Sequence, residues 1–226
     1  MTNGYLYCVY SIDQQPNKFF TDEFLVSLQS LKKVLPTCNV SLYTNIVFDN
    51  IYGIDHVIYD SQIDKNHICK AVGLLKSPYQ KTILLDTDTL IHRSIINDIF
   101  KVLDDFNFTC CHGNFWASGQ IYPDLNTGLI GVNKNKFTDE QITQWITKHR
   151  KNKCKSDQKY FRDIFLEHKK DFYILPAYFM YRWHHYKDYP EQAVISHEHC
   201  MSKEKITKKI INIYSKSINY KEETLD

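Results

Sequence analysis

The sequence lacks several features that mark common classes of protein. No two of its seven cysteines have the Cys-x-x-Cys spacing, and their odd number and scattered positions argue against a disulfide framework. No apolar run approaches the length that crosses a membrane. Residues 1–5 show neither the basic region nor the apolar region of a signal peptide. We therefore expect a soluble, cytoplasmic protein that works in a reducing compartment without a transmembrane segment.

A large excess of one charge and several catalytic signatures are also missing. The formal net charge is only +2 over 226 residues. Dedicated nucleic-acid binders usually carry a strong basic surplus, so we expect no nucleic-acid partner. The chain has no Gly-rich phosphate loop of the GxxxxGK[ST] or GxGxxG type, and no HExxH or GxSxG motif. The run His-Glu-His-Cys at 197–200 lacks the well-spaced partners of a zinc site.

The first ninety residues alternate between short apolar runs and helical patterns. Strands are predicted at 6–12, 40–43, 56–59 and 82–85, and helices at 22–35 and 67–76. Such alternation is typical of a parallel sheet whose two faces are covered by helices. Ligands of these sheets bind in a crevice at the carboxyl ends of the strands.

Further elements are predicted beyond residue 90. Strands are predicted at 106–111, 129–132, 172–175 and 193–195, with a Gly-containing loop at 112–126. Helices are predicted at 137–149, 157–168 and 203–219. The last helix is basic, so it either contacts an anionic membrane surface peripherally or covers the core with a solvated face. Because the sequence shows no internal repeat and no linker, we expect one domain.

Two carboxylates directly follow the predicted strand at 82–85. Asp86 and Asp88 are spaced i and i+2, so their side chains leave the chain on the same face. Two oxygen donors at a sheet crevice suit a divalent cation that holds a polyphosphate. A solvated loop or an acidic helix N-terminus is the alternative explanation.

The segment from Lys70 to Leu90 resembles the core of the GT-A fold glycosyltransferases, and most closely that of the glycogenin and bacterial galactosyltransferase group. This resemblance implies an α/β, Rossmann-like single domain with a mixed, mostly parallel central sheet flanked by helices. It implies that Lys70, on the helix before the Asp86-Thr87-Asp88 strand, reaches the donor substrate. An ordinary surface lysine is the alternative.

Two downstream motifs also resemble that group. Asn126 and Gly128 match an Asn-x-Gly segment in which the Asn faces the donor sugar or the acceptor; a tight turn into a strand is the alternative. Asp157 and Gln158 match an Asp-Gln pair beside the reacting sugar. Helix capping after Ser156 is the alternative for Asp157.

The resemblance also implies the remaining site residues. His197 is the best match for a late histidine that completes the metal shell, and His199 is its rival; the Gly-x-x-Lys-Pro-Trp segment that follows this histidine in the family is absent. Tyr10 and Ser11 stand where the family contacts the base and ribose. The aromatic segment 183–186 forms either an acceptor shelf or core packing.

The combined expectation is a metal-dependent glycosyltransferase. Residues 1–90 would bind a nucleotide-diphosphate sugar, for which we expect UDP as the nucleotide, and residues 91–200 a glycan or glycoconjugate acceptor. Mixed carboxylate and imidazole ligands suit Mn²⁺ better than Mg²⁺. The resemblance implies retention at the anomeric carbon, and an inverting enzyme would use Asp157 as its base. A sugar-nucleotide nucleotidyltransferase and a non-catalytic carbohydrate-binding domain of the same fold are the alternatives.

Overall fold

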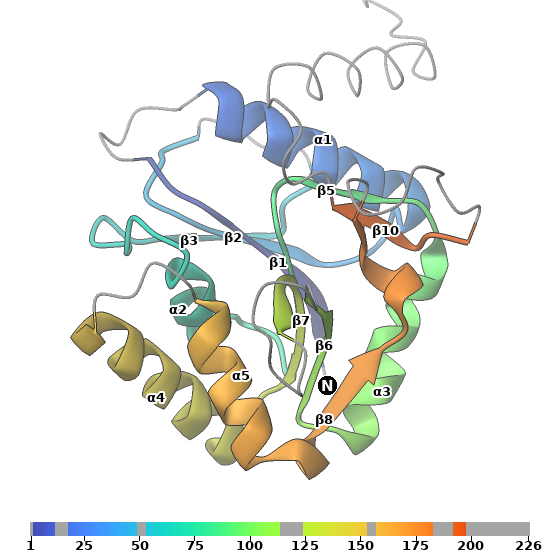
Figure 1. Cartoon of the computed structure of the whole chain (residues 1–226). Coiled ribbons are helices and arrows are strands. Elements are labelled where there is room, and N and C mark those ends of the chain that lie inside the picture. Colours follow the sequence, from blue (N-terminus) through green and yellow to red (C-terminus); the bar gives the residue numbers. More distant parts are fainter. Residues whose placement is uncertain are drawn as a thin grey trace, which may run out of the picture.

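The computed structural model describes residues 2–11, 18–48, 53–113, 124–152, 157–182 and 192–197. Within these ranges the chain forms a seven-stranded sheet with the order β3-β2-β1-β4-β7-β6-β8 (Figure 1). The strands are β1 (Asn3–Val9), β2 (Val40–Thr44), β3 (His56–Tyr59), β4 (Lys81–Leu85), β6 (Phe108–His112), β7 (Leu125–Asn133) and β8 (Phe172–Leu175). Of these seven strands, β7 runs against the other six. The predicted α/β class and mixed, mostly parallel sheet are confirmed.

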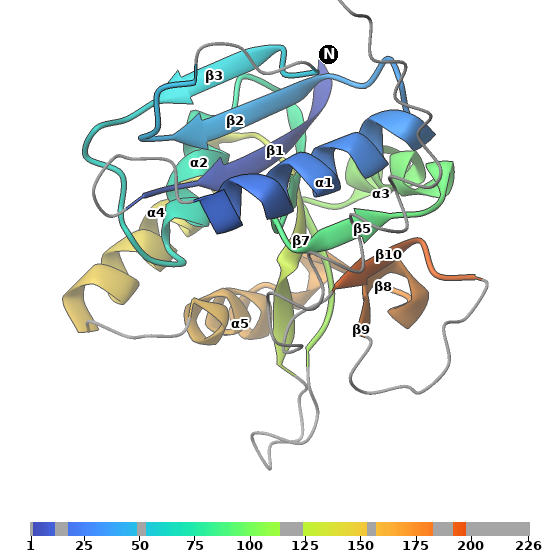
Figure 2. The same cartoon turned by 90° about the horizontal axis from the view of Figure 1, so that it is seen from above.

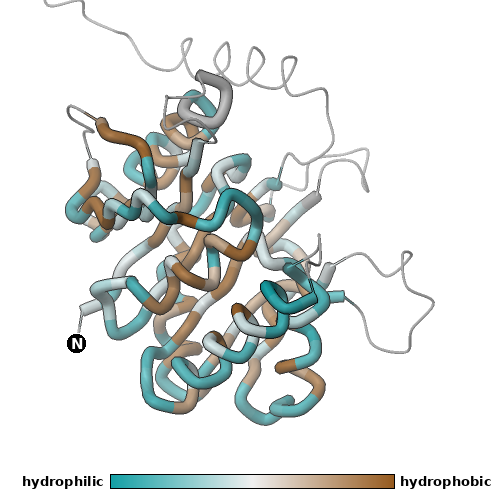
Figure 3. The backbone as a smooth tube through the Cα atoms, turned by 90° about the vertical axis from the view of Figure 1, so that its left-hand side faces the viewer, coloured by the Kyte–Doolittle hydropathy of each residue, from teal (hydrophilic) through white to brown (hydrophobic). Residues whose placement is uncertain are grey.

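Helices cover both faces of this sheet (Figure 1). They are α1 (Lys18–Val34), α2 (Cys69–Lys76), α3 (Ile99–Asp105), α4 (Lys136–Asn152) and α5 (Gln158–Glu167). Side chains alternate along β1, so Tyr5 and Tyr7 join the core under α1 and α3, while Leu6 joins the core under α2, α4 and α5. Figure 3 shows hydrophobic segments gathered in the interior and hydrophilic ones on outer turns.

A second, three-stranded sheet has the order β5-β10-β9. Its strands are β5 (Thr89–Ile91), β9 (Tyr181–Arg182) and β10 (Ile195–His197). β10 pairs antiparallel with β5, which places His197 opposite Thr89. Because β5 begins directly after Asp88, this pairing brings the late histidine to the paired aspartates.

Short 3-10 helices connect several of these elements. They are η1 (Ser94–Asp98), η2 (Lys169–Asp171) and η3 (Ala177–Met180). No helix in the described ranges is both long enough and apolar enough to cross a membrane. The five described cysteines are free thiols: Cys8, Cys38, Cys69, Cys110 and Cys111.

Most predicted elements are present, with shifted ends. The strand predicted at 6–12 ends at Val9, because the backbone at Ser11 bonds to the side chain of Asn45 instead of to a neighbouring strand. The strand predicted at 129–132 begins at Leu125, so Asn126 and Gly128 lie inside a strand and not in a tight turn. The strand predicted at 193–195 is found at 195–197. Helix α3 and strands β5 and β9 were not predicted.

Several predicted features lie outside the described residues. They are the capping residue Ser156, the aromatic segment 183–186, the alternative ligand His199 and the basic helix at 203–219.

Candidate metal and nucleotide site

Strand register gathers the predicted residues at one edge of the large sheet. Leu85 ends β4 and pairs with Tyr7 of β1 on one side and with Leu129 of β7 on the other. The next backbone N–H, that of Asp86, donates a hydrogen bond of 2.9 Å to the carbonyl oxygen of Gly128. The carboxyl ends of β1 and β4 therefore meet the beginning of the reversed strand β7, which is where open α/β sheets hold ligands.

Asp86, Asp88 and His197 form a compact cluster at this edge. One potential ligand atom from each lies within 4.8 Å of the other two. The Nε2 atom of His197 is 3.0 Å from Oδ1 of Asp88 and 3.6 Å from Oδ2 of Asp86. Two carboxylate oxygens and one imidazole nitrogen fit the ligand preference of a divalent cation such as Mn²⁺. The three residues predicted to bind metal are thus brought together.

Gly128 provides the space in which this cluster sits. A Cβ atom there would lie 2.9 Å from Cε1 of His197 and 3.0 Å from Oδ2 of Asp86. The first distance is shorter than real Cβ contacts show and the second is tighter than most of them, so a side chain here would displace His197 and press on Asp86. The glycine of the Asn-x-Gly motif is required by this close approach and not by backbone conformation.

Lys70, near the start of α2, is directed at the same aspartate. Its Nζ lies 2.6 Å from Oδ1 of Asp86 and 3.9 Å from Oδ2 of Asp157, and its side chain is only 13% exposed. Burial lowers the pKa of Lys70, but the two carboxylates outweigh burial and hold the pKa above its usual value. Two carboxylates thus flank the ammonium group, and Asp88 adds a third negative charge to the cluster that contains Asp86. This excess of negative charge favours a bound divalent cation.

Asp157 is buried directly before α5, beside Lys70. Its backbone carbonyl accepts a hydrogen bond of 3.0 Å from the indole Nε1 of Trp145 on α4. Its side chain makes no capping hydrogen bond to α5. The Asp157 side chain therefore does not cap α5, while a cap from Ser156 lies outside the described residues. The contact from Trp145 is one that sequence analysis missed.

Asn126 and Gln158 are placed differently. Asn126 is fully buried, and its Oδ1 accepts a hydrogen bond of 2.7 Å from the N–H of Gly128. Its Nδ2 has no hydrogen-bond partner among the described residues. Gln158 is the half-buried first residue of α5, next to Asp157.

A pocket of about 180 Å³ opens beside the aspartates. Five of its lining residues were predicted: Tyr10, Lys70, Asp86, Thr87 and Asp88. Five others were not: Cys8, Val9, Glu23, His67 and Cys69. Cys8 and Val9 could have been found as the last residues of a strand that leads to Tyr10. Glu23 reaches the pocket only through the packing of α1, which no local pattern reveals.

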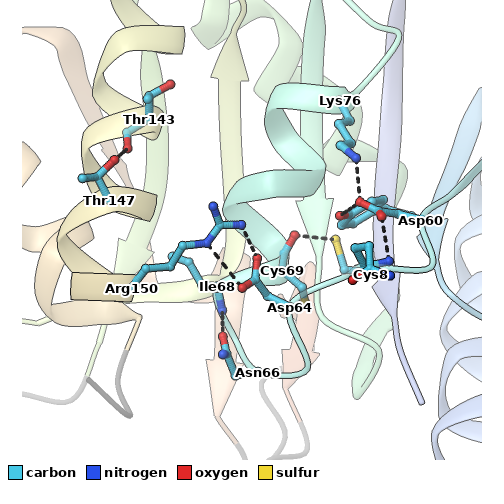
Figure 4. Close-up of polar contacts among 12 residues, drawn as sticks. Cys8, Asp60, Asp64, Asn66, Ile68, Cys69, Lys76, Thr143, Thr147 and Arg150 are labelled. Atoms are coloured by element: carbon cyan, nitrogen blue, oxygen red, sulfur yellow. Dashed lines mark hydrogen bonds and ion pairs between the residues drawn. The ribbon is translucent and has the colours of Figure 1, made fainter. Parts of the chain in front are cut away.

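The loop between β3 and α2 is fixed by polar contacts (Figure 4). Asp64 forms an ion pair with Arg150 of α4, with 2.6 Å between Oδ2 and Nη2. Asn66 Oδ1 accepts a hydrogen bond from the N–H of Ile68 at 2.9 Å. These contacts hold the chain just before Cys69 and Lys70, and so fix how α2 begins at the pocket.

Comparison with known proteins supports the fold assignment. No family model and no curated protein sequence matches the chain. It is similar in structure to the galactosyltransferase LgtC in complex with donor and acceptor sugar analogues, with a TM-score of 0.65, 12% identity, and coverage of 94% of this chain and 96% of that one.

Two further structures are similar to the chain. Mouse xyloside xylosyltransferase 1 gives a TM-score of 0.59 at 13% identity, over 88% of this chain and 98% of that one. The glycosyltransferase GlyE of Streptococcus pneumoniae gives a TM-score of 0.64 at 14% identity, over 97% of this chain and 66% of that one. At these identities the likeness establishes the fold, and the predicted resemblance to the GT-A fold glycosyltransferases is confirmed at that level.

Proposed function

We propose that the chain is a metal-dependent glycosyltransferase that uses a nucleotide-diphosphate sugar. The observation that carries the proposal is the cluster of Asp86, Asp88 and His197 beside buried Lys70, at the ligand edge of a sheet with the GT-A glycosyltransferase fold. Fold alone does not establish activity. The cluster supports an activity, because its carboxylates and imidazole can bind a metal ion and the neighbouring ammonium group of Lys70 can bind a diphosphate.

The donor would lie with its diphosphate toward Lys70 and its nucleoside toward Tyr10, Ser11 and Thr87. Asp86, Asp88 and His197 would hold Mn²⁺, with Mg²⁺ as the alternative. When bound, the cation supplies positive charge that stabilises the diphosphate as it leaves. We propose UDP as the nucleotide and assign donor binding to residues 1–90 and acceptor binding to residues 91–200.

The remaining residues would act on the sugar. As the bond between the anomeric carbon and the diphosphate oxygen breaks, positive charge develops on the ring, and the buried carboxylate of Asp157 would stabilise it. The free Nδ2 hydrogens of Asn126 could bond a sugar hydroxyl, and Gln158 would orient the acceptor hydroxyl that replaces the diphosphate. We propose retention at the anomeric carbon and a glycan or glycoconjugate acceptor.

A thermal-shift screen of UDP- and GDP-sugars, with Mn²⁺ or with EDTA, tests this proposal. A ligand bound by the native state alone raises the melting temperature by mass action. We expect a shift with one donor that requires Mn²⁺ and is absent in Asp88→Asn. No shift with any donor would contradict the proposal. A shift with free sugars that is unchanged by EDTA would favour a carbohydrate-binding domain. Release of pyrophosphate from a nucleoside triphosphate and a sugar phosphate would favour a nucleotidyltransferase.

A further inference from the structure

Tyr10, which lines the pocket, and its neighbour Ser11 lie beyond the end of the β1 ladder. The last pair between β1 and β2 is Val9 with Thr44, and β1 ends there. Ser11 is nevertheless buried, with 3% exposure, and its backbone groups need partners there.

Asn45 supplies both partners from its side chain. The Oδ1 atom of Asn45 accepts a hydrogen bond of 2.8 Å from the N–H of Ser11. The Nδ2 atom of Asn45 donates one of 2.8 Å to the carbonyl oxygen of Ser11. Asn45 is itself fully buried at the carboxyl end of β2. Its carboxamide therefore continues the ladder between β1 and β2 after the two backbones have separated.

Only a carboxamide can make this reciprocal contact. It presents one acceptor and two donors, whereas an ionised carboxylate only accepts and an alanine side chain does neither. Asn45 is also held in place by its neighbours. The carbonyl oxygen of Thr44 accepts a hydrogen bond of 2.8 Å from the N–H of Asp60, and Thr44 Oγ1 accepts one of 3.0 Å from the N–H of Ile46.

We propose that Asn45 is a positioning residue for the donor nucleotide. It does not line the pocket. It fixes Ser11 and, through the backbone, Tyr10, whose half-buried ring lines the pocket with Lys70 and Asp86. This inference rests on the proposed function, because it assigns the wall at Tyr10 to the nucleoside. It concerns nucleotide affinity and not metal affinity, since the metal cluster lies between β4 and β5 and on β10.

The test measures the affinity of UDP and of GDP by titration calorimetry in the presence of Mn²⁺, with the affinity of Mn²⁺ measured separately. In Asn45→Ala we expect nucleotide affinity to fall about tenfold, because the wall at Tyr10 would then have to be ordered at the moment of binding. Asn45→Asp should be weakened too, since the carboxylate cannot donate to Ser11. Mn²⁺ affinity should change by less than about twofold in both variants. A change this small is clearly distinct from the expected loss of nucleotide affinity.

Asn133→Ala is the matched control. Asn133 also makes two side-chain hydrogen bonds, one to the carbonyl oxygen of Leu103 and one from Gln80. It pairs with Lys81, at the opposite end of the same sheet. We expect a loss of unfolding free energy in Asn133→Ala with unchanged nucleotide affinity. An equal fall in nucleotide affinity in both variants would reduce Asn45 to a structural role and overturn the inference.

Other outcomes separate this inference from the proposed function. If the wild-type protein binds UDP or GDP and Asn45→Ala binds it equally well, the inference fails while the proposed function stands. If the wild-type protein binds neither nucleotide, both fail. Should Asn45→Ala not fold, hydrogen exchange on the wild-type protein decides. The amide of Ser11 should be protected before UDP is added, and exchange at the rate of an unstructured peptide would refute the positioning contact.

Discussion

The two oxygens of Asp86 have different neighbours, which would allow one carboxylate to bind a metal ion and a lysine at the same time. Oδ1 lies 2.6 Å from Nζ of Lys70, whereas Oδ2 lies 3.6 Å from Nε2 of His197. The ion pair fixes the rotation of the carboxylate, so Oδ2 remains on the side of the metal cluster. Under the proposed function, Lys70 would therefore orient a metal ligand as well as offer positive charge to a diphosphate.

Gly128→Ala tests whether the metal cluster depends on the space above β7. The new methyl group would meet His197 and Asp86 at 2.9 Å and 3.0 Å, so one or both must move. We expect Mn²⁺ affinity, measured by titration calorimetry, to fall about 10- to 100-fold, as for other disturbances of ligand orientation. Asp88→Asn should lose Mn²⁺ binding by removing a ligand directly. Undiminished affinity in Gly128→Ala would show that the cluster does not bind the metal as arranged.

Asp157→Asn tests the role of the buried carboxylate directly before α5. Because Asp157 makes no capping hydrogen bond with its side chain, we expect little change in the melting temperature. Turnover should fall by about 100-fold or more while the KM of the donor changes little, since the charge is needed in the transition state. Asp163→Asn, a change of the same kind on α5, is the control and should keep full activity. A loss of stability in Asp157→Asn without loss of turnover would restore a purely structural role.

At the scale of elements, helix α1 completes the outer edge of the small sheet (Figure 2). Ser30 is buried on α1, and its Oγ accepts a hydrogen bond of 2.9 Å from the N–H of Ile91 in β5. Ser27 Oγ lies 3.1 Å from Oγ1 of Thr89 and 3.0 Å from the hydroxyl of Tyr7. A helix thus supplies side-chain partners to an edge strand that would otherwise expose its backbone groups. β5 leads out of Asp88 and pairs with the strand of His197, so α1 supports the metal cluster indirectly.

Ser30→Ala should therefore destabilise the protein more than a surface serine or threonine would. It leaves the buried N–H of Ile91 without the acceptor that Ser30 supplies, which costs about 1–3 kcal/mol. The free energy of unfolding, measured by urea denaturation, gives the comparison. Thr147→Ala removes an exposed hydroxyl that bonds the carbonyl oxygen of Thr143 on α4 (Figure 4). We expect less than about 0.5 kcal/mol for that control. Equal effects would show that the contact between α1 and β5 contributes no special stability.

Elements of the first ninety residues were the most predictable part of the fold. The strand at His56–Tyr59 was predicted with its observed ends, because turn-forming residues lie on both sides of its short apolar run. β5 was missed because its three residues continue the apolar run of β4 after the aspartates, and only pairing with the distant β10 makes it a strand. β7 was predicted too short, because the polar residues Asn126 and Thr127 read as loop although both are buried.

At the scale of the whole molecule, the site was predictable where its residues follow one another along the chain. Asp86 and Asp88 directly follow one predicted strand, so the α/β pattern alone brings them to the ligand edge of the sheet. Lys70, on the helix before that strand, was identified by resemblance to a family. His197 was identified only by resemblance to a family, since over a hundred residues separate it from Asp88. Asn45 and Trp145 carried no signal, because a single Asn after a strand or a Trp on an apolar helix face is equally common in proteins without such a site.

Acid should destabilise the whole molecule through histidines that are partly or fully buried. Burial lowers the pKa of His92 from 6.5 to about 4, and it also lowers the pKa values of His112 and His149. Below pH 6.5 the unfolded chain therefore takes up protons that the folded protein does not. Stability is fully present above about pH 6.5 and is lost as the pH falls toward 4, where His92 titrates in the folded state as well.

The free energy of unfolding, measured by urea denaturation at several pH values with EDTA present, checks this prediction. One pKa unit corresponds to about 1.4 kcal/mol. Because the ring of His92 is only partly buried, we expect it to account for about 1–2 kcal/mol of the decrease between pH 6.5 and 4. His92→Gln should flatten the pH dependence by that amount, while the same change at exposed His56 should leave it unaltered. An unchanged slope in His92→Gln would mean that the acid sensitivity arises elsewhere and that the small sheet does not exclude the charged imidazole.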